Sequence, residues 1–266
     1  MNIAGKVAVV TGGAGGGSGG AISARLATEG ANVVVVDVDQ DAGAQQVHAI
    51  TEAGGSATFF AADVRHPATV NVLMDFVDAQ FGGLDVVVNN ATDDPGGRGP
   101  LDEWAKSIDI DLLGPALLLR ASVERMRKRG GGAVVNVGST SALPHGDGHS
   151  TWPAYDAAKA GIIRLTTSLD WLRQDGIRVN CLVPGWIASP PVRSYVDSLS
   201  DDQRRERGVP DRLLTPDEVA SAVLRLLVDD SLAGRVLLLR NDQPPALIAA
   251  GDPGYAALEL LPEHYV

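Results

Sequence analysis

Short apolar runs rich in valine recur along the chain, and segments with a helical pattern separate them. Continuous runs of this length are typical of strands that are buried on both faces of a parallel sheet. The first run ends at Thr11-Gly12 and the second at Asp37, so polar residues follow directly where strands stop. Strands are predicted in this way at 6–10, 32–37, 57–61, 84–88, 133–137, 178–183 and 234–239.

The intervening segments carry helix signals. A long helix is predicted over about 101–129, and Gly130 to Gly132 stop it. A second helix is predicted to start at Tyr155 and to end near Gly176. Strands that alternate with helices predict an α/β protein.

Composition narrows the class of protein. The 266 residues are 45% hydrophobic, which excludes a disordered chain and suits one large domain. A net charge of −11 argues against nucleic-acid and anionic-membrane partners, and no apolar run is long enough to span a bilayer. The N-terminus lacks a basic segment followed by an apolar one, so we expect a cytoplasmic protein. Cys181 is the single cysteine, and no metal site is predicted.

The glycine-rich stretch at 12–20 lies between a strand and a helix, and a second strand follows that helix. This order is the context of a dinucleotide-binding turn, in which glycines let the backbone approach a pyrophosphate at a helix N-terminus. Asp37 ends the second strand, where a carboxylate accepts hydrogen bonds from ribose hydroxyls and repels a 2′-phosphate. The glycine loop contains no Arg or Lys. We therefore predict NAD(H) rather than NADP(H), although Asp37 also suits a turn cap.

Tyr155 and Lys159 are four residues apart on a predicted helix and so share a face. The tyrosine hydroxyl has a pKa of about 10 when unperturbed, and a fixed positive charge beside it favours the phenolate. Tyr155 is thus a candidate acid or base. A surface pair with this spacing arises readily by chance.

From Lys6 to about Asn241 the chain resembles the short-chain dehydrogenase/reductase family, on Thr11-Gly12, Gly17-Ser18-Gly19, Asn90-Ala91, Ser139, Tyr155 and Lys159. The resemblance implies a single-domain Rossmann-like, doubly wound sheet of about seven parallel strands with helices on both faces. It implies catalytic roles for Ser139, Tyr155, Lys159 and Asp111. It also implies cofactor contacts, which fall on Gly12, Gly17, Ser18, Gly19, Asp37, Asp63, Val64, Asn90, Ala91, Tyr155, Lys159, Pro184, Gly185, Ile187 and Ser189.

The chain departs from the family pattern at several positions. The glycine loop has one extra residue between Gly12 and Gly17. Thr92 stands where the family usually has Gly, and Asp111 stands at the position of its catalytic Asn. The last strand is followed by Arg240-Asn241-Asp242 instead of Asp-Gly-Gly.

The predicted organisation is a domain at 1–242, with a substrate lid at about 186–214, and a C-terminal tail at 243–266 that suits a subunit interface. The resemblance implies a homotetramer or homodimer. We predict an NAD(H)-dependent oxidoreductase that interconverts a secondary alcohol and a ketone, with a small molecule as its partner and no nucleic acid or membrane. An NADP(H)-dependent carbonyl reductase and a non-catalytic NAD(H)-sensing protein are the alternatives.

Overall fold

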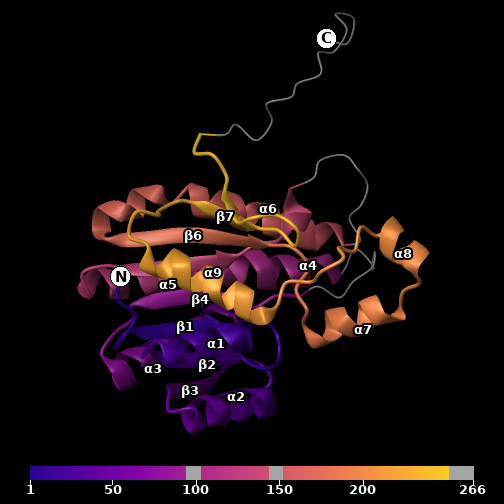
Figure 1. Ribbon diagram of the computed structural model, residues 1–266. Coiled ribbons are helices and arrows are strands. Elements are labelled where there is room, and N and C mark those ends of the chain that lie inside the picture. Colours follow the sequence, from indigo (N-terminus) through magenta and orange to yellow (C-terminus); the bar gives the residue numbers. More distant parts are fainter. Residues whose placement is uncertain (94–102, 144–151, 252–266) are drawn as a thin grey trace, which may run out of the picture.

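A computed structural model describes residues 1–93, 103–143 and 152–251 (Figure 1). Its sheet has the strand order β3-β2-β1-β4-β5-β6-β7-β8. The first seven strands are parallel, as the sequence predicts, and β8 is antiparallel to β7. The strands span Val7–Thr11 (β1), Asn32–Asp37 (β2), Ser56–Ala61 (β3), Val86–Asn89 (β4), Gly132–Val137 (β5), Ile177–Pro184 (β6), Val236–Leu239 (β7) and Ala246–Leu247 (β8).

Helices cover both faces of this sheet (Figure 1). Their α-helical segments span Ser18–Thr28 (α1), Gln40–Glu52 (α2), Pro67–Phe81 (α3), Trp104–Ile108 (α4), Gly114–Lys128 (α5), Pro153–Thr167 (α6), Pro190–Ser198 (α7), Asp201–Glu206 (α8) and Pro216–Val228 (α9). Three further segments are a π-helical turn at Asp109–Leu113 (η2) and 3₁₀ turns at Thr140–Ala142 (η3) and Asp170–Asp175 (η4). The predicted α/β fold with a doubly wound sheet is confirmed.

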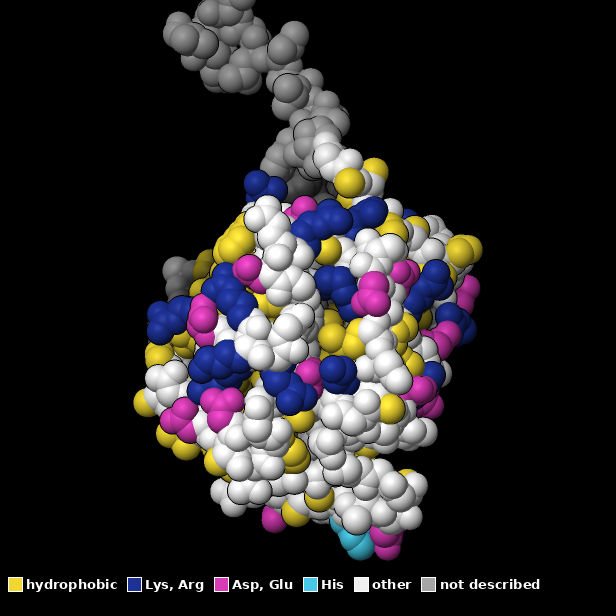
Figure 2. Space-filling view, turned by 90° about the vertical axis from the view of Figure 1, so that its left-hand side faces the viewer, with side chains coloured by type: hydrophobic (Ala, Val, Ile, Leu, Met, Phe, Trp, Pro, Cys, Tyr) yellow, Lys and Arg dark blue, Asp and Glu magenta, His cyan; other side chains and the backbone are white. Residues whose placement is uncertain are grey.

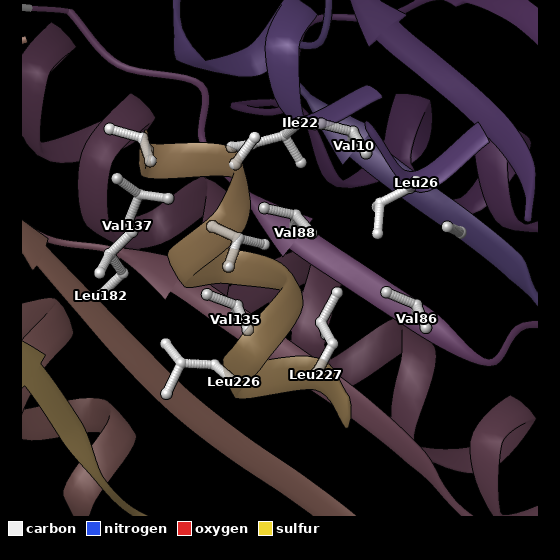
Figure 3. Close-up of a cluster of buried hydrophobic side chains, with 14 of the residues drawn as sticks. Val10, Ile22, Leu26, Val86, Val88, Val135, Val137, Leu182, Leu226 and Leu227 are labelled. Carbon is white, nitrogen blue, oxygen red and sulfur yellow. The ribbon is translucent and has the colours of Figure 1, made fainter. Parts of the chain in front are cut away.

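The core lies in two layers, because successive strand residues point to opposite faces. Val10 and Val88 belong to the layer beneath α1 and α9, to which Leu26 of α1 and Leu226 of α9 also contribute (Figure 3). Val9 belongs to the opposite layer, which helices α3 and α5 cover. Burial on both faces explains why the strands read as unbroken apolar runs.

Two predicted helices differ from the structure in detail. The long helix contains the π-helical turn η2, and its first residues, 101 and 102, lie outside the described residues. The helix that holds Tyr155 begins at Pro153 and ends at Thr167, and η4 continues to Gly176. A proline suits a first helical turn, where a backbone N–H has no intrahelical partner.

The sheet also continues past the domain boundary predicted at residue 242. Residues of β8 pair with β7, so part of segment 243–266 extends the sheet, whereas 252–266 lie outside the described residues.

The strand order changes direction between β1 and β4. In open α/β sheets, ligands bind at the carboxyl ends of the strands beside such a switch point. The carboxyl ends of four strands are occupied by Thr11, Asp37, Asn89 and Pro184. Ser139 follows the carboxyl end of β5 by two residues. The fold therefore brings these predicted site residues to the carboxyl ends of the strands.

Candidate active site

The glycine loop is closely packed against the backbone that follows β4. Gly12 has a φ of +58°, and a Cβ there would lie 2.8 Å from Cα of Ala91. A Cβ on Gly19 would lie 1.8 Å from the carbonyl oxygen of Gly12. A Cβ on Gly15 would meet nothing within 4 Å, so only its φ of +76° favours glycine at that position. Only glycine fits Gly12 and Gly19, because any Cβ would strike backbone atoms.

Asn90, the residue directly after β4, holds the glycine loop in place through hydrogen bonds of its side chain. Its side-chain amide donates to the carbonyl oxygens of Thr11 at 3.2 Å and Gly12 at 3.0 Å. Its own oxygen accepts from the hydroxyl of Ser18, the first residue of α1, at 2.8 Å. Gly17 is the N-cap of α1 and has no side chain to satisfy the free N–H groups. An N-terminus of this kind is suited to an anion.

Asp37 is held beside the loop by three backbone amides. Its Oδ2 accepts from the N–H of Ala14 at 3.2 Å, and its Oδ1 accepts from Val38 at 2.8 Å and Asp39 at 3.2 Å. The side chain is half-buried at the end of β2. A carboxylate is thus fixed next to the glycine loop.

Asp63 and Val64 lie beyond β3. Both carboxylate oxygens of Asp63 accept from the Arg65 side chain, and this pairing lowers the pKa of Asp63. Val64 is buried and packs close to Gly114 at the start of α5. The contact between Asp63 and Arg65 was not predicted from the sequence.

The turn after β6 is held in place by Asn241. The amide of Asn241 accepts from the N–H of Trp186 at 3.0 Å and donates to the carbonyl oxygens of Trp186 at 2.8 Å and Arg212 at 2.9 Å. A Cβ on Gly185 would lie 2.1 Å from Asn241 Oδ1. The departure from the family pattern at this position therefore brings a side chain that fastens segment 186–214 to the end of β7.

The same turn leads into α7. Ile187 bridges to Leu214, and Ser189 is the N-cap of α7, with no hydrogen bond from its side chain to the helix. A Cβ on Gly16 would lie 3.3 Å from Pro190, and one on Gly17 would lie 3.9 Å from Ser189. The start of α7 thus borders the glycine loop.

Lys159 is buried in α6, with 3% of its side chain exposed. Its ammonium donates to the carbonyl oxygen of Val137 at 2.9 Å and lies 2.9 Å from Oδ1 of Asp111. The ammonium is also 5.3 Å from the ring centroid of Tyr155. Burial lowers the pKa of Lys159, but Asp111 and Tyr155 outweigh this effect, and the pKa is raised overall.

Asp111 lies in the π-helical turn η2 and is completely buried. Its Oδ1 accepts from the hydroxyl of Thr92 at 2.6 Å, and its Oδ2 accepts from the N–H of Asp93 at 3.1 Å. π-turns within helices are frequent at functional sites. This one carries the carboxylate that contacts Lys159.

Ser139 lies where β5 leads into η3, and it is half-buried, as is Tyr155. Its hydroxyl accepts from the N–H of Ser141 at 3.2 Å and from the Ser141 hydroxyl at 3.0 Å. The bond from Lys159 to Val137 ties α6 to the end of the same strand. Ser139, Tyr155 and Lys159 are therefore brought to one end of β5 from sequence positions up to twenty residues apart.

Comparison with known proteins gives the family. Residues 6–199 match the model of the short chain dehydrogenases. The chain belongs to this family. It is 38% identical to cis-4-hydroxycyclohexanecarboxylate dehydrogenase of Sinomonas cyclohexanicum, over 84% of this chain and 90% of that protein. It is 33% identical to 3beta-hydroxysteroid dehydrogenase 1 of Eggerthella lenta, over 86% and 89% of the two chains.

The fold is similar to that of solved members. A crystal structure of a short-chain dehydrogenase/reductase from Burkholderia xenovorans superposes with a TM-score of 0.81 at 32% identity, and covers 90% of this chain and 96% of that one. The family binds a nicotinamide dinucleotide, and the residues of this dehydrogenase fit that group. Gly12 and Gly19 keep a cradle open that a Cβ would fill, and the N-terminus of α1 faces it without a side-chain cap.

A buried polar network links β4, β5 and α6. Asn89 donates to Asn136 at 2.8 Å, and Asn136 donates to Thr166 at 2.9 Å. Cys181 is fully buried, and burial raises the pKa of its thiol to about 12. Cys181 is thus a core residue.

The start of α6 is joined to α4 by a tryptophan. Trp152 is buried and donates its ring N–H to Ser107 at 2.6 Å, so it anchors the start of α6 to α4. His145 and His149 lie outside the described residues. Within residues 1–93, 103–143 and 152–251, no cluster of His, Cys, Asp and Glu suits a metal ion.

The same part of the chain contains no helix with the length and apolar character needed to cross a bilayer. The face at the amino ends of the strands carries interspersed basic and acidic side chains (Figure 2). At the amino ends of β1, β4 and β5, Lys6 and Arg129 pair with the buried Asp85, at 3.4 and 3.0 Å. These two ion pairs lie at the opposite end of the strands from the predicted site residues.

Proposed function

We propose that this dehydrogenase is NAD(H)-dependent and interconverts a secondary alcohol and a ketone, with Tyr155 as the acid and base. The observation that carries the proposal is the fixed ammonium of Lys159, 5.3 Å from the Tyr155 ring and anchored on Val137 and Asp111. A cation held in a buried position favours the phenolate form of a neighbouring tyrosine. Tyr155 can then take a proton from an alcohol or return one to a ketone.

Ser139 would orient the substrate oxygen. Its hydroxyl accepts two hydrogen bonds from Ser141, which leaves its own proton available for the substrate. A donor placed in this way stabilises negative charge that develops on the oxygen during the reaction. The nicotinamide, when bound, supplies or accepts the hydride.

The cofactor preference rests on Asp37. Backbone amides of Ala14, Val38 and Asp39 hold its carboxylate next to the glycine loop. This position suits hydrogen bonds to the ribose hydroxyls of NAD(H) and repels the 2′-phosphate of NADP(H). The two alternatives differ from this proposal in a measurable property. An NADP(H)-dependent carbonyl reductase would bind NADPH more tightly, and a non-catalytic NAD(H) sensor would bind NADH without turnover.

The substrate class is supported by the names of two relatives, since both specify a hydroxyl on a ring. Segment 186–214, which contains α7 and α8, would form the lid over the substrate, because its start borders the glycine loop at Gly16. The partner is then a small molecule. We further propose that the protein is cytoplasmic and forms a homodimer or homotetramer.

Calorimetric titration with NADH and with NADPH tests the cofactor first. We expect NADH to bind more tightly, and a preference for NADPH would favour the carbonyl reductase. A panel of cyclic and open-chain secondary alcohols with NAD⁺ then tests activity, with Tyr155→Phe as the variant. Binding of NADH without turnover of any alcohol or ketone would favour the sensor. Full turnover by Tyr155→Phe would contradict the role of Tyr155.

A further inference from the structure

One buried side chain is hydrogen-bonded near both ends of segment 186–214. Asn241 follows β7 and is 8% exposed. Its amide accepts from the N–H of Trp186, where the segment begins, and donates to the carbonyl oxygens of Trp186 and Arg212. We propose that Asn241 is a positioning residue, which sets the position of the lid before cofactor and substrate bind. The inference rests on the proposed function, in which segment 186–214 is the lid.

The two ends of the segment also lie side by side and form a neck, made of residues 186–188 and 212–214. Leu214 donates its N–H to the carbonyl oxygen of Trp186 at 2.8 Å, and Ala188 donates to the carbonyl oxygen of Leu214 at 2.8 Å. Such a short pairing of two segments is marginally stable in water. Asn241 adds three hydrogen bonds from the end of β7, so the neck is anchored to the sheet.

The anchoring reaches the lid helices through the side chain of Trp186. Figure 1 shows α7 and α8 projecting from one end of the domain. The Trp186 ring stacks on Tyr195 of α7, with 6.3 Å between centroids and 15° between planes. The hydroxyl of Tyr195 accepts from Nη1 of Arg207, the C-cap of α8, at 2.6 Å. Aromatic stacking favours particular ring arrangements, so a fixed Trp186 helps to fix both helices.

The same side chain supports the turn that carries predicted cofactor contacts. Gly185 precedes Trp186, and a Cβ on Gly185 would lie 2.1 Å from Oδ1 of Asn241, so the amide fills the space that this glycine leaves. The family pattern has glycine at position 241, which has no side chain to form these bonds. A lid that is ordered in advance loses less conformational entropy when a ligand binds. Asn241 should therefore act on affinity and not on the chemical step.

Hydrogen–deuterium exchange tests the anchoring without any substrate. In Asn241→Ala the N–H of Trp186 loses its acceptor, and the neck keeps only its backbone bonds. We expect the amides of Trp186, Ala188 and Leu214 to exchange roughly fivefold faster or more, the factor that corresponds to about one net hydrogen bond. The amide of Cys181, within β6, should exchange as in the wild type. Unchanged exchange at the neck would overturn the proposal.

Asn180 provides a matched control. It is also a buried asparagine, and its amide accepts from the N–H of Arg235 and donates to the carbonyl oxygens of Leu226 and Leu232. These bonds join β6 to the end of α9 and to the residues before β7, and not to the neck. Asn180→Ala therefore removes a similar set of bonds and should leave exchange at the neck unchanged. Faster exchange at the neck in both variants would indicate a general loosening and would overturn the proposal.

A second substitution separates hydrogen bonding from space filling. Asn241→Asp keeps the size of the side chain and an oxygen that can accept from Trp186, but it has no N–H to donate to the carbonyl oxygens of Trp186 and Arg212. It should loosen the neck as Asn241→Ala does, and wild-type exchange in this variant would overturn an anchor made of hydrogen bonds. Circular dichroism checks folding, and Asn241→Ser replaces Asn241→Ala if that variant does not fold.

Steady-state kinetics with a secondary alcohol and NAD⁺ distinguishes a positioning residue from a catalytic one. We expect Asn241→Ala to raise KM roughly fivefold or more, because apparent affinity falls with the fraction of molecules whose lid is in place. The value of kcat should stay within about twofold of the wild type, since the bound complex reacts normally. Asn180→Ala should retain both values. A lower kcat with an unchanged KM in Asn241→Ala would overturn the proposal.

The two sets of variants also separate this inference from the proposed function. If Tyr155→Phe is inactive while Asn241→Ala matches the wild type in exchange and in KM, only the anchoring by Asn241 fails. If Tyr155→Phe keeps full turnover while the neck of Asn241→Ala exchanges faster, the proposed role of Tyr155 fails and the anchoring is supported.

Discussion

Asp111 and Lys159 form an ion pair inside the protein, with 2.9 Å between Oδ1 and Nζ and side chains that are 0% and 3% exposed. The pair joins η2 to α6, and hydrogen bonds from Thr92 and Asp93 complete the surroundings of the carboxylate. A buried ion pair offsets its desolvation cost only with such additional hydrogen bonds. Each of the two buried charges is therefore stabilised by the other, and loss of one leaves the other without a counter-charge.

Removal of one member should destabilise the fold. Asp111→Leu leaves the Lys159 ammonium buried without a counter-charge, and we expect a loss of about 3 to 5 kcal/mol in the free energy of unfolding. The double variant Asp111→Leu, Lys159→Met removes both charges and should recover most of that loss. Urea unfolding measures all three proteins. Equal losses in the single and double variants would contradict the ion pair as the cause.

The same pair predicts a dependence of stability on alkaline pH. The pKa of Lys159 is raised in the folded protein above its usual 10.5, so the folded state holds this proton more firmly than the unfolded state. The contribution is fully present below pH 10.5 and is lost as pH rises from there through the folded pKa. Measured against the charge-free double variant, the wild type should keep a constant stability difference from pH 7 to 9 and lose it above 10.5. A difference that changes between pH 7 and 9 would argue against this assignment.

Asp37 should control the choice of cofactor. At an effective dielectric constant of about 20, a charge about 5 Å from a 2′-phosphate costs about 3 kcal/mol. Asp37→Asn removes the charge but keeps one oxygen, which can accept from Val38 and Asp39 as Oδ1 of Asp37 does. We expect NADPH binding to improve by roughly tenfold to a hundredfold. Calorimetry with both cofactors is the measurement, and an unchanged ratio of affinities would exclude Asp37 as the selector.

Gly19 and Gly17 offer a matched pair in the glycine loop. A Cβ on Gly19 would lie 1.8 Å from a backbone oxygen, whereas one on Gly17 would approach nothing closer than Ser189 at 3.9 Å. Forced overpacking costs about 1 to 3 kcal/mol. Gly19→Ala should therefore lower the midpoint of thermal unfolding and abolish NADH binding, while Gly17→Ala should unfold like the wild type. Normal stability of Gly19→Ala would mean that the loop is not packed as described.

The thiol of Cys181 should not react with thiol reagents in the native protein. Burial raises the pKa of its thiol to about 12, and the thiolate is the reactive form. Ellman's reagent should leave the native protein unmodified at pH 8 and release one equivalent of chromophore in urea. Rapid reaction of the folded protein would contradict the burial of this side chain.

Periodicity alone gave the parallel strands, because a strand buried on both faces must be apolar throughout. β1 and β2 were recognisable for this reason, and so was the glycine loop between them. The π-helical turn was not predictable, since η2 carries the same apolar spacing as the helix around it. The short β8 was also missed, because a strand of two residues has no period to read.

The sequence by itself determined which groups are available: Ser139, Tyr155 and Lys159 in family order, Asp37 after the second strand, and Asp111 and Thr92 as departures. It could not determine the structural effect of those departures, because that effect depends on contacts between residues that are distant in the chain. Tertiary structure decided that Thr92 reaches Asp111, that Asp111 pairs with Lys159, and that Asn241 fastens the turn after β6. Local propensity depends on near neighbours, whereas the partner of a buried charge is set by the packing of whole elements.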